Sequence, residues 1–269
     1  MVFLAAILAW LIALSITGHH LPSTQPMQQW VDRQVERFGV SNAVFLAMLL
    51  GPVFLAALVL WWVDSWLLTL LLSILALVLA FGPGDQVDQL KRYRQFRADG
   101  DDEAAYQLGI EHLGLPEGLY ENGTDTMDEA LKEGLAYQLF QRFFVSFFWF
   151  VAFGIPGVLL VGLLVLLEPV FRYHNGASVA IQFRHAVNWI PVRLLVLSMG
   201  LVGNFAHTFA IWLRRVREFE ITDRAFLWSG IKAALPAESS AQRPEDLLLL
   251  LKRAQILWLV VLALFIIFG

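Results

Sequence analysis

Three polar side chains interrupt a long apolar run, and they are the residues of this sequence best placed to bind a ligand. The run, Asn188–Leu213, is long enough to cross a bilayer and contains Arg193, Asn204 and His207. In a continuous helix these three lie on one stripe, together with Leu197, Gly200 and Ile211. Each polar group costs a few kcal/mol in lipid, so the stripe should face protein or water. It therefore either holds a helix bundle together or lines a site.

Two acidic residues complete the set of candidate site residues. Glu168 follows the fourth apolar run, and Asp64 separates the second run from the third. We expect both acids on the same membrane side as Arg193, where either could pair with the arginine. We predict no metal site, because the chain has no cysteine and the neighbouring His19 and His20 would point in different directions on a helix.

A second interruption lies in the middle of the apolar run 143–167, at Gly154-Ile155-Pro156-Gly157. Proline removes a helical hydrogen-bond donor, and glycine loosens the backbone. We expect a kinked helix that still crosses the membrane in full. The alternative is a broken helix in which Gly154, Pro156 and Gly157 free backbone groups that line a site, as in transporters.

The composition indicates an integral membrane protein. The chain has 269 residues, of which 58% are hydrophobic and only 16% charged, whereas soluble domains average about 25% charged residues. The net charge of −4 indicates no nucleic-acid partner. A Gly-rich phosphate-binding loop with a lysine is missing from the sequence, so nucleotide binding has no direct support.

We predict an all-α integral membrane protein with about six transmembrane helices and a small helical cytoplasmic segment between spans three and four. A span needs about 20 apolar residues, or slightly fewer in a thin bilayer. The spans are expected at residues 1–16, 43–63, 65–81, 143–167, 188–213 and 256–268.

Three consecutive parts follow from this assignment. Residues 1–82 hold three N-terminal spans and an amphipathic cytoplasmic helix at 25–38, whose apolar side should dock on another helix. Residues 83–142 form the cytoplasmic helical segment. Residues 143–269 hold three C-terminal spans with a cytoplasmic loop at 214–253.

The basic residues predict the orientation of the chain. The first, third and fifth loops carry two, six and eight lysines and arginines, whereas the second carries none and the fourth carries two. The odd loops are therefore cytoplasmic, and both termini are periplasmic. A chain reversal at Gly154–Gly157 would move the basic loop 214–253 to the outside, which favours a full crossing there.

Three motifs in this order resemble one superfamily. The segment Asn188-Trp189-Ile190-Pro191-Val192-Arg193-Leu194 looks like the "D/N-aromatic-I/V-P-A/V-R-L" signature of the AmpE and CobD/CbiB superfamily. The stretch 98–105, Ala-Asp-Gly-Asp-Asp-Glu-Ala-Ala, resembles its Gly-Asp-x-Glu-Ala-Ala helix start, and 147–157 resembles its "LFW…G-x-PG" membrane segment. The motif residues Asn188, Trp189, Pro191 and Arg193 therefore carry the resemblance.

The residues before the "LFW" segment separate the two branches of this superfamily. In the CobD/CbiB enzymes, which join an amine to a corrinoid carboxyl with ATP, the resemblance implies Glu-Asn and a nearby Asp at this place. This chain has Tyr137, Gln138 and Gln141 instead. Carboxylates are the natural ligands for Mg²⁺ beside a phosphate, and amides are much poorer ones. A retained scaffold without these acids is similar to the AmpE branch.

The AmpE resemblance implies a non-enzymatic sensor or signalling modulator of the bacterial inner membrane, linked to β-lactamase induction and peptidoglycan recycling. Two alternatives stay open, an adenosylcobinamide-phosphate synthase of CobD/CbiB type and a transporter for a small solute such as a muropeptide. We expect no catalytic residue and no cofactor. The expected partners are the lipid bilayer and a cell-wall recycling component or other membrane protein.

Overall fold

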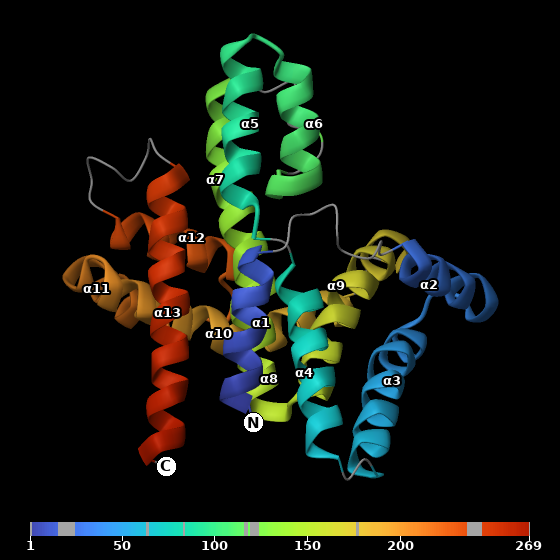
Figure 1. Ribbon diagram of the computed structural model, residues 1–269. Helices are drawn as coiled ribbons and strands as arrows, with labels where there is room; N and C mark the ends of the chain where they lie inside the picture. The colour runs from blue at the N-terminus through green and yellow to red at the C-terminus, as the bar shows by residue number, and fades with distance from the viewer. Residues whose placement is uncertain are drawn as a thin grey trace. The chain divides into compact units, whose positions relative to one another are not determined.

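The computed structural model describes residues 2–15, 25–62, 65–82, 84–115, 118, 124–175, 178–235 and 244–268, and these residues form helices without any strand. A π-helical turn, Phe140–Val145, joins the seventh α-helix to the eighth. In chain order (Figure 1) the α-helices of this part of the chain are α1 (Val2–Ser15), α2 (Gln25–Phe38), α3 (Asn42–Trp62), α4 (Trp66–Phe81), α5 (Gln86–Ala98), α6 (Asp102–Leu113), α7 (Thr124–Leu139), α8 (Ser146–Phe153), α9 (Ile155–Asn175), α10 (Ser178–Val202), α11 (Phe205–Arg215), α12 (Asp223–Ala234) and α13 (Pro244–Phe268).

Several helices have the length and apolar composition of membrane spans, which confirms the predicted all-α multi-pass fold. Among the described residues they are Asn42–Trp62, Trp66–Ala98, Met127–Phe153, Ile155–Arg172, Val179–Val202 and Pro244–Phe268. The apolar part of the second is α4, since α5 is polar. Trp61 and Trp62 end α3 with 83% and 81% of their surface exposed, as expected of tryptophans at a membrane interface. With 14 residues, α1 is shorter than these six.

The helices divide into two compact units, each made of two separate stretches of sequence. Unit 1 comprises Met1–Gly82 and Val145–Ile190, and unit 2 comprises Pro83–Phe144 and Pro191–Gly269. The boundaries fall inside the π-helical turn and inside α10. The predicted division into three consecutive parts concerns membrane sides and stays a prediction.

Unit 1 is built on close helix packing against α4 and α9. The alanines at positions 5, 9 and 13 of α1 are buried where α1 packs on α4; such small residues let two helix backbones approach each other closely. Helix α3 packs against α9, and the rings of Phe45 and Phe171 meet edge to face there with centroids 5.4 Å apart.

The Gly154 segment reverses the chain, so the prediction of one kinked crossing over residues 143–167 is wrong. Helix α8 ends at Phe153, α9 begins at Ile155, and the two pack against each other (Figure 1). Gly154 has φ 66°, a conformation that favours glycine. A Cβ on Gly157 would lie 2.1 Å from the Trp149 carbonyl oxygen, so only glycine allows this close approach. Pro156 lies in the first turn of α9, where its missing N–H is not needed.

Unit 2 is organised along α7, against which α6, α12 and α13 pack. Lys232 of α12 forms an ion pair with Glu129 of α7 at 2.8 Å. Deeper in the unit, the rings of Phe144 and Trp258 contact each other with centroids 5.2 Å apart. At the start of α13, the Glu245 carboxylate accepts a hydrogen bond of 2.8 Å from Arg94 of α5.

The predicted single helix over Asn188–Leu213 is also wrong, because Gly203 and Asn204 separate α10 from α11. The backbone N–H of Asn204 donates to the carbonyl of Ala234 at the end of α12, at 2.9 Å. A Cβ on Gly203 would lie 2.6 Å from the same carbonyl oxygen. The end of α12 therefore occupies the space that a continuous helix would need.

Candidate functional site

Arg193 of α10 is buried and binds backbone carbonyl groups. With 4% of its surface exposed, it donates from Nε to the Val216 carbonyl and from Nη2 to the Glu218 carbonyl, both at 2.8 Å. Its guanidinium also lies over the ring of Phe226, 4.9 Å from the centroid. Val216 is the residue that ends α11, where helix carbonyls lack partners in the helix and attract positive charge. Arg193 thus holds the carboxyl end of α11.

Asn204 holds the other end of α11. Its side-chain oxygen accepts a hydrogen bond from the His207 backbone N–H at 3.3 Å, which is a helix N-cap. The Asn204 amide nitrogen and the His207 Nδ1 are 3.0 Å apart. Further along α11, the Trp212 indole N–H donates to the carbonyl of Arg193 at 2.9 Å.

The structure therefore brings the three polar residues of the stripe together around one short helix, rather than along one face of a long one. Arg193 and Asn204 secure opposite ends of α11, and His207 lies in its first turn. The sequence indicated that these groups need polar partners. It could not identify them, since backbone carbonyls and amides leave no signature in residue type.

Two of the family motifs meet in unit 1 through a carbonyl that a proline leaves without its helical partner. Pro191 has no N–H, so it cannot donate to the carbonyl of Val187 one turn earlier in α10. The Trp149 indole N–H of α8 donates to this carbonyl at 3.1 Å. A neighbouring helix thus satisfies the backbone group that the proline frees, as membrane proteins require. Asn188 and Trp189 follow Val187 in the chain, and Asn188 is buried.

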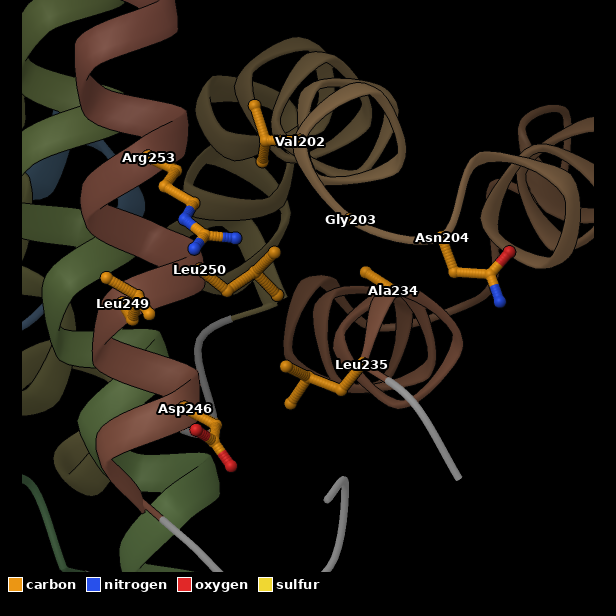
Figure 2. A pocket seen from close by; sticks show the side chains of 9 residues that line it. All are labelled: Val202, Gly203, Asn204, Ala234, Leu235, Asp246, Leu249, Leu250 and Arg253. Carbon is orange, nitrogen blue, oxygen red and sulfur yellow. The ribbon is translucent and has the colours of Figure 1, made fainter. Parts of the chain in front are cut away.

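A cavity of about 470 Å³ lies in unit 2 beside the break between α10 and α11 (Figure 2). One wall is α13, from which Arg253 extends toward the cavity, with Asp246 two turns earlier (Figure 2). The opposite wall consists of the end of α10, the break and the end of α12; its residues are Val202, Gly203, Asn204, Ala234 and Leu235. The Asn204 amide points away from α13 (Figure 2), in keeping with its capping role. Of the polar stripe, Asn204 lines this cavity.

A second cavity of unit 2, of about 440 Å³, lies where α5, α6, α7 and the start of α13 meet. Sequence reasoning did not identify it. The Tyr93 hydroxyl donates to Asp128 at 3.0 Å, and Arg97 pairs with Asp102. In the Gly-Asp-x-Glu-Ala-Ala motif, Asp101 caps α6 by accepting from the Ala104 N–H at 3.0 Å. This motif starts a helix here, as the resemblance implied.

Of the two candidate acids, the structure describes Glu168. Glu168 is buried in unit 1, where one carboxylate oxygen pairs with Arg172 and the other with Arg184, the latter at 2.8 Å. A buried carboxylate that binds two arginines is a typical structural ion cluster. Asp64 lies outside the described residues.

The positions that carry acids in the enzyme branch lie in and just before the π-helical turn. Gln141 is buried within the turn. Tyr137 lies in α7, with the guanidinium of Arg224 5.1 Å from its ring centroid. Within the ranges that the structure describes, no three histidine or acidic side chains lie close enough to hold a metal ion.

Comparison with known proteins gives a match over nearly the whole chain. Residues 4–269 match the family described as "Regulatory signalling modulator protein AmpE". The chain is also 28% identical over 190 residues to a "Cobalamin biosynthesis protein CobD" of Chromobacterium violaceum, an alignment that covers 66% of this chain and 57% of that protein. No solved structure matches the chain. The match to the signalling modulators spans both units, and the chain therefore belongs to the AmpE family.

Proposed function

We propose that this chain is a non-enzymatic signalling modulator of the bacterial inner membrane that acts in β-lactamase induction and peptidoglycan recycling. The observation that carries the proposal is the AmpE family match over residues 4–269. The partners of Arg193 support it, because this arginine binds protein carbonyls that position α11. These contacts give Arg193 a structural role, in keeping with a chain that is not an enzyme.

The test is complementation in a host from which its own AmpE-family gene has been deleted. We expect the wild-type chain to restore β-lactamase induction by a β-lactam, and Arg193→Ala to restore less at equal abundance in the membrane. Arg92→Ala, a change at an exposed arginine of α5, should restore induction like the wild type. If neither the wild type nor any variant alters induction, the proposal is wrong.

The similarity to a cobalamin biosynthesis protein favours one alternative, a CobD/CbiB-type synthase. Such an enzyme would join an amine to a corrinoid carboxyl with ATP and Mg²⁺, and would need acidic ligands near the π-helical turn. The purified chain should show no ATP-dependent corrinoid ligation, and clear ligation would replace our proposal. The transporter hypothesis used both the break at Gly154–Gly157 and the polar stripe, and the structure divides this stripe between α10 and α11.

We further propose that both termini face the periplasm. Contacts within unit 2 support this orientation, because they bring the basic segments of the sequence to one side. Arg94 of α5 binds Glu245 at the start of α13, and Lys232 of α12 binds Glu129 near the start of α7. Basic segments face the cytoplasm, so α13 starts on the cytoplasmic side and ends in the periplasm.

The crossings of the chain can then be counted from α7 onward. The continuous helical run Thr124–Phe153 crosses outward, and α9 returns after the reversal at Gly154. Helix α10 would thus start on the cytoplasmic side, and its end lies beside α12 and the start of α13, which are also cytoplasmic. In this account α10 enters the bilayer without crossing it. The reversal at Gly154 adds one crossing to the predicted number, and α10 removes one because it returns to the side on which it started. The basic loop 214–253 therefore stays on the cytoplasmic side.

A reporter fused to the C-terminus tests this orientation. Alkaline phosphatase folds to an active enzyme only in the periplasm, whereas green fluorescent protein exported in unfolded form stays dark there. We expect an active phosphatase fusion after residue 269 and a dark fluorescent-protein fusion at the same site. The opposite pair of results would invert the orientation.

A further inference from the structure

Helix α11 has the composition of a helix that lies on a membrane surface. The rings of Phe205, Phe209 and Trp212 stack along it with centroids 5.1 and 6.0 Å apart. Phe205 and Leu213 are 48% and 56% exposed. An apolar side that stays exposed on a short helix needs a partner outside the described fold.

Three arginines at the end of α11 give this surface a positive charge. Arg214, Arg215 and Arg217 are all exposed. Among the residues that the structure describes, none of the three forms an ion pair with an acid. Guanidinium groups bind phosphate oxygens through paired hydrogen bonds. The surface therefore combines an apolar side with groups that recognise phosphate.

The position of α11 in unit 2 indicates a lipid surface rather than open water. Arg253 is the last charged residue of α13, and the remaining residues of that helix to Phe268 carry no charge. This arginine therefore marks the depth at which α13 enters the bilayer. Gly203 and Asn204, from which α11 starts, line the same cavity as Arg253. Helix α11 thus begins at the level of the lipid headgroups.

We propose that α11 lies in the membrane interface and that Arg214, Arg215 and Arg217 bind anionic phospholipid headgroups. Arg193 and Asn204 hold the two ends of α11 and leave Phe205 and Leu213 available to the acyl chains. Burial of this side and attraction of the arginines to a negative surface both favour the bound state, and each basic residue near such a surface contributes about fivefold in affinity.

The absence of cysteine from the sequence makes a single-label experiment direct. Leu213→Cys places a fluorophore on the exposed apolar side of α11, and Glu111→Cys places one on the exposed part of α6 as a reference. The labelled full chain is reconstituted in vesicles of phosphatidylcholine, with or without about one third phosphatidylglycerol, and quenched with spin-labelled lipids. We expect strong quenching at position 213, which phosphatidylglycerol increases, and none at position 111.

The arginines are tested in the same vesicles with matched double changes. Arg214→Gln with Arg215→Gln should raise the amount of phosphatidylglycerol needed for half-maximal quenching at least fivefold. Lys91→Gln with Arg92→Gln removes two exposed charges from α5 and should leave it unchanged. Equal quenching with and without phosphatidylglycerol, or a water-exposed label at position 213, would overturn the proposal. Protection of the label in native membranes but not in vesicles would also overturn it, because it would assign this surface to a protein partner.

Discussion

At Gly154 the chain reverses and α8 packs against α9, whereas at Gly203 the chain turns from α10 into α11 and the break contacts the end of α12. Both breaks interrupt apolar runs that are long enough to cross a bilayer. The residues after each glycine account for the difference. Pro156 and Gly157 allow a new helix to start at once and to pack on the previous one, while Asn204 caps a helix whose path is fixed by Ala234 and Arg193.

In both runs the glycine marks a break in the helix, but it does not determine the path of the chain after the break. The path depends on close contacts with another helix: the Trp149 carbonyl of α8 at the first break and the Ala234 carbonyl of α12 at the second. The following substitutions test each partner in turn.

The largest effect is expected at the first break. Gly157→Ala places a Cβ against the Trp149 carbonyl oxygen, so α8 and α9 must separate, and the free energy of unfolding should fall by about 3 kcal/mol or more. Gly162→Ala is the matched control, since it lies on the same helix with no atom within 4 Å of the added Cβ. SDS titration of the protein in mixed micelles measures both. Equal stability of the two variants would contradict the close packing of this hairpin.

Removal of the arginine that holds α11 should have the next largest effect. Arg193→Ala loses two charge-assisted hydrogen bonds to carbonyls and leaves a cavity, so stability should fall by about 2 kcal/mol while membrane insertion persists. Hydrogen exchange should accelerate in α11 and leave α9 unchanged. Wild-type stability in this variant would show that Arg193 does not anchor the helix.

The N-cap at the second break should contribute less. Asn204→Ala removes the acceptor for the His207 N–H and should cost about 1 kcal/mol. Asn204→Asp keeps an acceptor at the same place and should cost less. Equal losses of stability in the two variants would show that Asn204 does not stabilise α11 as its N-cap.

An effect of similar size is expected at the contact between the two family motifs. Trp149→Phe removes the donor to the Val187 carbonyl and should cost about 1 kcal/mol. In a Pro191→Ala background the helix supplies its own N–H to this carbonyl, so the same change should cost less. A double-mutant cycle measures the coupling. Zero coupling would show that Trp149 does not replace the bond that proline removes.

The class of fold could be predicted from the sequence, because long apolar runs with few charges have no stable place in water. The burial of Arg193 could also be anticipated from its position in such a run. Its partners could not, since the Val216 and Glu218 carbonyls lie 23 and 25 residues away and any residue type would supply them.

The path of the chain after each break could not be predicted from the sequence for a related reason. The Gly-Ile-Pro-Gly segment is compatible both with a kink and with a reversal, and the choice depends on how closely α8 and α9 can pack. The predictions for Gly154 and Gly203 both failed. In the proposed orientation the reversal at Gly154 adds one membrane crossing and the non-crossing α10 removes one, so the side of the following loop is unchanged. The proposed orientation is therefore the one that the basic residues predict, although two of the expected spans have a different structure.

The most direct test of this account is the accessibility of single cysteines in intact cells to a membrane-impermeant maleimide. Phe153→Cys labels the turn of the hairpin, Glu220→Cys the segment between α11 and α12, and Glu111→Cys the exposed part of α6. We predict labelling of position 153 from outside, and labelling of positions 220 and 111 only after the inner membrane is permeabilised. Labelling of positions 153 and 220 from the same side would show that α10 crosses the membrane and would contradict the account.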